Sequence, residues 1–155
     1  MSIDPGATTP DEETLARAVL GRGLALTPVP GGEPALDLVW STGASGGGPA
    51  LVEGSDNLAQ DLAVALLTPL GSDPFNAGFG FDGLRVLSMA LGPAMREQML
   101  QVAVVRTLLA DSRVTDVGDV VLEPLDAARR QVVRATVRTV LGAEVPMTLG
   151  QVDQG

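Results

Sequence analysis

Apolar residues recur every three to four positions in two separate stretches of the chain. In the first, Leu58, Leu62 and Leu66 share one side of a 3.6-residue repeat. This spacing predicts an amphipathic helix over residues 55–67. In the second, residues 93–110 are apolar over more than one stripe, so we expect a longer helix that is covered on more than one side.

The stretch 129–141 alternates between apolar and polar positions with a period of two. A strand places Val133 and Val137 on one face. It places Arg134 and Arg138 on the other. A helix would also align arginines four residues apart, but the density of β-branched residues favours a strand.

Two further strands are expected beside this one. Residues 117–123 are predicted to form a strand that ends at Pro124. Residues 145–149 form a short final strand. Pro146 confines this strand to the edge of a sheet, because proline has no N–H to donate to a neighbour.

The beginning of the chain carries weaker signals. Residues 10–20 are predicted to form a short helix, with Thr9 as its N-cap and Gly21 at its C-terminal end. Residues 23–40 predict a hairpin around a Pro-Gly-Gly turn. Residues 41–49 are rich in glycine and predict a flexible loop.

These elements predict an α+β fold. Two main helices pack on a small mixed or antiparallel sheet, and an N-terminal helix and hairpin are added to it. We expect the chain to divide into an extension over residues 1–50 and a core domain over residues 51–155. A chain of 155 residues is long enough to bury one such core.

A segment rich in glycine and proline, residues 68–83, separates the two main helices. It contains all three phenylalanines of the chain. A segment this apolar is expected to pack on the domain instead of extending into solvent. The residues expected to fix its course are Thr68, Gly71, Pro74 and Gly80.

The composition excludes several kinds of chemistry. The chain has no His, Cys, Tyr or Lys, which excludes imidazole and thiolate relays, Schiff bases and imidazole metal ligands. The formal net charge of −9 disfavours nucleic acid and anionic membranes as partners. The sequence also lacks a long apolar run and a signal-peptide pattern, so we expect a cytoplasmic protein that does not insert into membranes.

Carboxylate chemistry remains open. A cell-wall glycosidase needs two carboxylates at a set separation, and the candidates are Glu53, Glu97 and Glu123. Nothing in the sequence pairs them, and the aromatic content of 3% leaves few residues on which a sugar could stack. Asp116 and Asp119 lack the ligand spacing of a cation loop. We therefore expect no catalytic residue, metal or cofactor, with the glycosidase as the alternative.

Arg130, Arg134 and Arg138 form the best-ordered polar row of the sequence. They either form a solvated strand face or recognise an acidic surface through their forked donors. Residues 1–124 carry a net charge of −10, whereas residues 125–155 carry +1. The acidic surface could therefore belong to this chain or to a partner.

Several motifs between residues 66 and 113 resemble those of a known family. Leu66-Leu67-Thr68-Pro69-Leu70-Gly71 follows the first main helix, and Pro74 precedes Phe79-Gly80. After the second main helix, Asp111-Ser112-Arg113 stands where the family has Glu-Pro-Arg. In their order and spacing these motifs resemble the GPW-type small baseplate wedge proteins of contractile phage tails and phage-like injection systems, which are often mislabelled as lysozyme-like. The resemblance covers about residues 51–142.

The resemblance implies a structural, non-enzymatic role in a baseplate that assembles in the cytoplasm as part of a tail-like particle. Members of the family bind wedge or triplex subunits and template the first ring of sheath subunits through strand pairing. The implied partners are the sheath protein and wedge or triplex subunits, with a central spike or hub as a further option. The residues expected at these interfaces are Asp111, Arg113, Arg130, Arg134, Val137 and Arg138.

Overall fold

The computed structural model describes residues 11–29, 35–43, 46–124 and 131–149. In these residues the chain forms helices and short antiparallel strands, which confirms the predicted α+β class. The two main helices lie where the sequence predicts them, and the short third helix was not predicted. The helices are α1 (Glu12–Leu20), α2 (Gly54–Leu67), α3 (Leu84–Leu87) and α4 (Pro93–Leu109).

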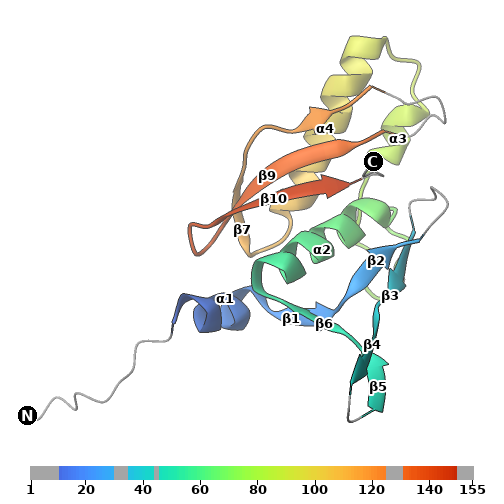
Figure 1. Ribbon diagram of the computed structural model, residues 1–155. Coiled ribbons are helices and arrows are strands. Elements are labelled where there is room, and N and C mark those ends of the chain that lie inside the picture. The colour runs from blue at the N-terminus through green and yellow to red at the C-terminus, as the bar shows by residue number, and fades with distance from the viewer. Residues whose placement is uncertain (1–10, 30–34, 44–45, 125–130, 150–155) are drawn as a thin grey trace, which may run out of the picture.

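A four-stranded antiparallel sheet lies in the C-terminal half of the chain (Figure 1). Its strands are β7 (Val114–Val117), β8 (Val121–Leu122), β9 (Val133–Thr139) and β10 (Glu144–Leu149). β9 is the central strand. β10 pairs along one side of it, and β7 and β8 pair in succession along the other side.

The alternation predicted for the central strand is confirmed. Ala135, Val137 and Thr139 are buried on one face of β9, whereas Arg134 and Arg138 are exposed on the other. The strand is therefore amphipathic, and its apolar face points toward the helices.

The predicted strand over residues 117–123 is corrected. β7 begins three residues earlier, at Val114, and a register shift follows directly in its pairing with β9. Gly118 then donates its N–H to the Thr136 carbonyl at 2.7 Å. The pairing resumes only in β8, so two short strands replace one continuous strand.

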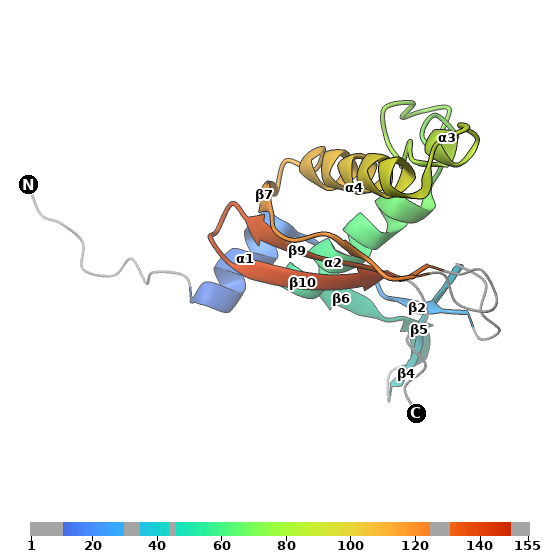
Figure 2. The same cartoon turned by 90° about the horizontal axis from the view of Figure 1, so that it is seen from above.

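α2 lies between the C-terminal sheet and the N-terminal strands, and α4 crosses beside it (Figures 1 and 2). Leu58 and Leu62 of α2 are fully buried and meet Leu108 of α4 and Val137 of β9 in one core cluster. Burial of each such side chain contributes about 1.5–3 kcal/mol. Leu20 at the end of α1 joins the same cluster.

The strands before α2 form three short antiparallel pairs. β2 and β3 form the predicted hairpin, with Leu26 opposite Leu38. β1 pairs with β6, which brings Gly23 opposite Val52. The bounds of these strands are β1 (Arg22–Leu24), β2 (Leu26–Pro28), β3 (Leu36–Leu38), β4 (Trp40–Gly43), β5 (Gly46–Pro49) and β6 (Leu51–Glu53).

The flexible loop predicted for residues 41–49 is wrong. β4 and β5 pair as a second hairpin, with Trp40 opposite Pro49 and Ser41 opposite Gly48. The Ser41 hydroxyl also donates to the Gly48 carbonyl at 3.1 Å. Glycines carry no side-chain pattern, so backbone pairing of this kind leaves no periodic signal in the sequence.

The N-cap of α1 also differs from the prediction. Asp11 caps the helix, and its carboxylate accepts the Thr14 N–H at 2.8 Å. The predicted cap, Thr9, lies outside the described residues. Gly21 ends the helix with a φ of +81°, as predicted. The division into residues 1–50 and 51–155 stays a prediction.

Candidate functional site

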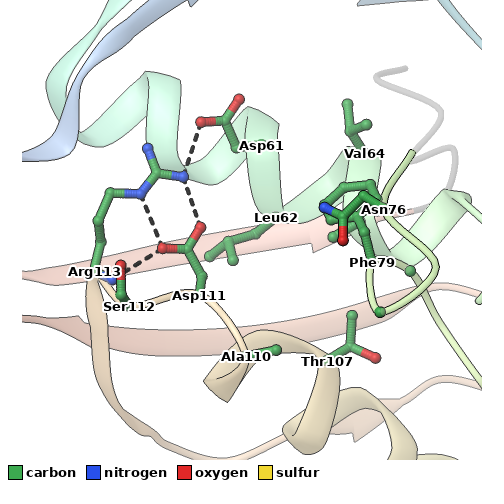
Figure 3. A pocket seen from close by; sticks show the side chains of 13 residues that line it. Asp61, Leu62, Val64, Asn76, Phe79, Thr107, Ala110, Asp111, Ser112 and Arg113 are labelled. Atoms are coloured by element: carbon green, nitrogen blue, oxygen red, sulfur yellow. Dashed lines mark hydrogen bonds and ion pairs between the residues drawn. The ribbon is translucent and has the colours of Figure 1, made fainter. Parts of the chain in front are cut away.

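The turn between α4 and β7 holds the arginine that the sequence singles out. The Arg113 Nε lies 2.9 Å from Oδ1 of Asp111, and its Nη2 lies 2.6 Å from Oδ2 (Figure 3). The backbone N–H of Arg113 donates to the same Oδ1 at 2.9 Å. Asp111 and Arg113 therefore form a bidentate pair within the chain. Their expected role at an interface with other subunits stays a prediction.

Arg113 also connects two helices that lie far from it in the sequence. Its Nη2 donates to Asp61 Oδ2 of α2 at 2.9 Å (Figure 3), and its Nη1 donates to the Leu20 carbonyl at 2.7 Å. Leu20 ends α1, so the guanidinium satisfies a carbonyl that has no partner within the helix. Four of the five guanidinium N–H donors are thus directed at oxygen atoms of this chain.

These contacts shift the pKa values of Asp111 and Arg113. The hydrogen bonds from Arg113 lower the pKa of the Asp111 carboxyl below its ordinary value, although partial burial acts in the opposite direction. The same bonds, together with the one to Asp61, raise the pKa of Arg113. Two carboxylates surround one guanidinium, so the cluster keeps one net negative charge.

Asn57 extends the cluster into the core. Its side chain is 2% exposed, and its Nδ2 lies 3.1 Å from both the Leu20 carbonyl and Asp61 Oδ2. The apolar spacing of α2 places this residue outside the apolar stripe, yet it is buried. The i, i+4 spacing of Asn57 and Asp61 is the one local signal that the two act together.

Gln60, about one turn further along α2, also bonds to backbone groups that lie far away in the sequence. Its Nε2 donates to the Leu24 carbonyl at 2.8 Å, and its Oε1 accepts the Leu26 N–H at 2.7 Å. One side-chain amide thus bridges the junction between β1 and β2. Sequence reasoning missed this contact because the partners are 34 and 36 positions apart.

The segment between α2 and α3 is closed by a short strand-like bridge. The Phe81 N–H donates to the Thr68 carbonyl at 2.8 Å, and the Leu70 N–H donates to the Phe81 carbonyl at 3.0 Å. Gly80 has a φ of +116°, and a Cβ there would lie 2.5 Å from the Thr68 carbonyl oxygen. Only glycine fits this position.

The other predicted loop residues are less constrained. Thr68 donates its hydroxyl to the Val64 carbonyl at 2.8 Å, and Gly71 adopts a φ of +80°. Pro74 lies in an exposed turn. The expectation that the phenylalanines pack on the domain is wrong for Phe75, which is 98% exposed, although Phe81 does pack against the core.

A cavity of about 540 Å³ lies between α2, the segment after it and the end of α4 (Figure 3). Asp61 lines it from α2, Gly80 from the segment, and Asp111 and Arg113 from the turn. The fold thus brings together motifs that are 52 positions apart, from Asp61 to Arg113.

The arginine row is placed on the solvent-facing side of β9, as predicted. Arg134 Nε lies 2.7 Å from Glu123, and Arg138 Nη2 lies 3.0 Å from Glu144. Both arginines therefore pair with carboxylates of their own chain. Arg130 lies outside the described residues.

Val137 lies inside the sheet, whereas β10 lies at its edge. Val137 is fully buried and lies opposite Val145 on β10 and Val117 on β7. Its side chain cannot reach a partner in this fold. Within the described residues no strand pairs with the outer side of β10, as the position of Pro146 predicts.

The candidate catalytic carboxylates come from three separate elements. Glu53 pairs with Arg17 at 2.6 Å, and Glu123 pairs with Arg134. Glu97 is exposed on α4. The part of the chain that the structure describes contains no group of three or more residues suited to hold a metal ion, and no helix there could span a membrane.

Comparison with known proteins relates this chain to others through its fold. No family model matches the sequence, and no curated protein is similar to it. The fold is similar to that of a protein from Geobacter sulfurreducens named as a candidate tail lysozyme, with a TM-score of 0.50 and 15% identity. The match covers 64% of this chain and 93% of that one. At this identity the likeness establishes a shared fold.

Proposed function

We propose that this chain is a structural component of the baseplate of a contractile phage tail or related injection particle. It binds wedge or triplex subunits and templates the first ring of sheath subunits through strand pairing. Three observations support the proposal: the motif resemblance, the fold shared with a protein named as a tail lysozyme, and the outer edge of β10. The proposed strand pairing depends on the outer edge of β10.

The hydrogen-bonding direction of β10 follows from its register. The Thr139 N–H donates to the Ala143 carbonyl at 2.9 Å, which begins an alternating series of bonded pairs. Val145, Met147 and Leu149 therefore bond toward β9. Glu144, Pro146 and Thr148 direct their backbone groups outward, and proline is tolerated at 146 because no donor is needed there.

The outer edge thus offers three carbonyls, from Glu144, Pro146 and Thr148, and two N–H groups, from Glu144 and Thr148. An extended arm of a sheath subunit could add to this edge through main-chain hydrogen bonds. Pro146 leaves one gap in the ladder. This gap limits unspecific pairing with other chains.

The edge is also backed by a rigid support. Val145 and Met147 of β10 are buried in the core cluster and anchor the strand, whereas Glu144, Pro146 and Thr148 are exposed. A substitution at Val137 would disturb this support, because Val137 is paired on both sides. Substitutions that test strand pairing are therefore placed on β10.

Thr148 provides a matched pair of substitutions. Thr148→Pro removes an outward N–H and leaves the bonds to β9 in place, whereas Thr148→Val keeps that N–H. Each variant is introduced into a strain that lacks the native gene, and particles are viewed by electron microscopy. We expect sheathed particles with Thr148→Val and absent or misassembled sheaths with Thr148→Pro.

Two results would contradict the proposal. Normal sheaths in the deletion strain would remove the baseplate role altogether. Normal sheaths with Thr148→Pro would remove strand pairing at β10 and leave the baseplate role to be explained by another surface. Circular dichroism and a thermal melt of both variants check that each one folds.

The name of the structural neighbour, a tail lysozyme, suggests a second candidate, a cell-wall glycosidase. Such an enzyme needs two carboxylates about 5–10 Å apart. Glu53 and Glu123 are each held by an arginine, which opposes this role. Peptidoglycan hydrolysis by the purified chain that is lost in Glu53→Gln, Glu97→Gln or Glu123→Gln would establish the enzyme.

A further inference from the structure

A second surface of the protein is a groove of about 440 Å³ between α3 and α4. On α4 it is lined by Met95, Met99, Val102 and Arg106, which follow one another at spacings of three and four residues and form a single stripe. The stripe extends about 16 Å along the helix, at about 1.5 Å per residue. This length matches three turns of a second helix.

The groove is apolar and exposed. Met95 is 52% exposed and Val102 is 56% exposed, and Met89, just after the end of α3, adds a third apolar side chain from the facing wall. Three of the five methionines of the chain thus line one groove. Methionine is flexible and polarizable, and it is over-used at surfaces that receive apolar faces of other proteins.

The floor of the groove is preformed. Val86 of α3 is buried with Leu100 of α4 and Leu122 of β8 in a second core cluster. This cluster holds α3 against α4 and keeps the groove open. A partner therefore meets a surface that does not have to be reorganised before binding.

The charge of the groove is opposite to that of the chain. Asp82 and Arg106 pair at 2.8 Å across one end and cancel. Arg85 also lines the groove, and the structure gives it no ion pair within the described residues. The groove thus carries one net positive charge in a protein whose formal charge is −9.

We propose that the α3–α4 groove is the docking site for an amphipathic helix of a partner protein, which places apolar residues on the methionine stripe and a carboxylate on Arg85. A helix suits this site because both walls are helices with no backbone edge to extend. The carboxylate follows from charge complementarity. The proposal does not depend on the role of β10.

A second copy of this chain fits the groove less well, because two chains of charge −9 repel each other. The long-range field of the chain also opposes an acidic partner. At about 0.15 M salt, however, charges more than about 8 Å apart are largely screened. The attraction between Arg85 and a nearby carboxylate therefore outweighs the long-range repulsion. Binding of an acidic helix is therefore a sharp prediction.

The test uses the intact protein and two designed helical peptides of about 18 residues. Both carry leucines at helical spacing on one face. One carries glutamates on its flanks and the other carries lysines at the same positions. Binding is followed through the ¹³C-labelled methyl groups of methionine, because Met89, Met95 and Met99 report on the groove and buried Met147 serves as an internal reference.

We expect the acidic peptide to bind at least about tenfold more tightly than the lysine peptide at about 0.15 M salt. Its addition should shift Met89, Met95 and Met99 and leave Met147 in place. Val102→Glu should abolish binding, and Arg85→Glu should reverse the preference between the two peptides. Leu109→Glu, on the same helix but outside the groove, should bind like the native chain.

Three outcomes would overturn the proposal. The first is equal or tighter binding of the lysine peptide. The second is binding that leaves the three groove methionines unshifted. The third is a shift of these methionines with protein concentration alone, which would assign the groove to a second copy of this chain. The methyl spectrum shows whether Val102→Glu folds, and Arg85→Glu tests the same site by charge alone.

Discussion

Arg113 and Asp111 meet edge to edge, with the Nε–Oδ1 distance at 2.9 Å and the Nη2–Oδ2 distance at 2.6 Å. The two residues are only two positions apart, so the pair also fixes the turn between α4 and β7. The far side of the guanidinium reaches the Leu20 carbonyl at the end of α1. A single side chain therefore joins the turn to α1 and α2, and a lysine could not reproduce this fork.

We expect Arg113→Ala to lower the free energy of unfolding by about 2–3 kcal/mol, because it leaves the Asp111 side chain without its guanidinium partner and removes one of the two donors to the Leu20 carbonyl. Partial exposure of the Arg113 side chain, at 23%, keeps the loss below that of a fully buried pair. Arg113→Lys should cost about 1–2 kcal/mol, since it keeps the charge and loses the fork. Urea denaturation measures both values.

Arg138→Ala is the matched control for this prediction. Arg138 pairs with Glu144 at 3.0 Å in an exposed position. Exposed pairs contribute about 0–1 kcal/mol, so the control should change the stability little. Equal losses at Arg113 and Arg138 would show that the bidentate contacts of Arg113 contribute no more than an exposed ion pair.

The depressed pKa of Asp111 predicts a pH-dependent stability. Its folded-state pKa is below the ordinary value of 3.8, so its contribution is fully present above that value and is lost as the pH falls through the folded-state pKa. We expect Asp111→Asn to be less stable than the native chain at neutral pH. The difference should narrow below about pH 4.

Urea titrations of the native chain and Asp111→Asn from neutral to acidic pH measure this difference. The pKa of Asp11 is also lowered, by its hydrogen bonds with Thr14, but that group is present in both proteins and cancels in the comparison. A difference that stays constant to the lowest pH would show that Asp111 does not titrate as proposed.

Gly80 and Gly48 make a matched pair for a backbone prediction. At Gly80 a Cβ would approach the Thr68 carbonyl oxygen to 2.5 Å at a φ of +116°, whereas at Gly48 nothing lies within 4 Å of it. We expect Gly80→Ala to lower the unfolding free energy by about 2 kcal/mol or more. Gly48→Ala should change it by less than about 0.5 kcal/mol. Equal values would contradict the close approach at Gly80.

The periodic elements of this fold can be predicted from the sequence because their apolar faces are long. α2 and α4 carry repeats over three or more turns, and β9 alternates over seven residues. These patterns report directly on burial. Pro146 likewise marks the edge strand, because its missing N–H restricts where it can lie.

Contacts between distant residues could not be predicted in this way. Asp61 and Leu20 both bind Arg113, at separations of 52 and 93 positions, and no local pattern connects them. The hairpin of β4 and β5 was missed for a related reason, since a run of glycines pairs through its backbone alone. Asp111 and Arg113 were both singled out because they lie within one short motif, but their contact with each other was not predicted.

The arginine row offers a last prediction, which separates its two interpretations. Arg134 Nε lies 2.7 Å from Glu123 Oε1, with both side chains partly exposed. A double-mutant cycle with Arg134→Ala and Glu123→Ala should give a coupling energy of about 0.2–1 kcal/mol that falls as salt is added. The same cycle between Arg134 and Glu144 should give no coupling, because Glu144 pairs with Arg138. If Arg134 and Glu123 are also uncoupled, the charge of Arg134 is not used within the chain, and recognition of an acidic partner becomes its role.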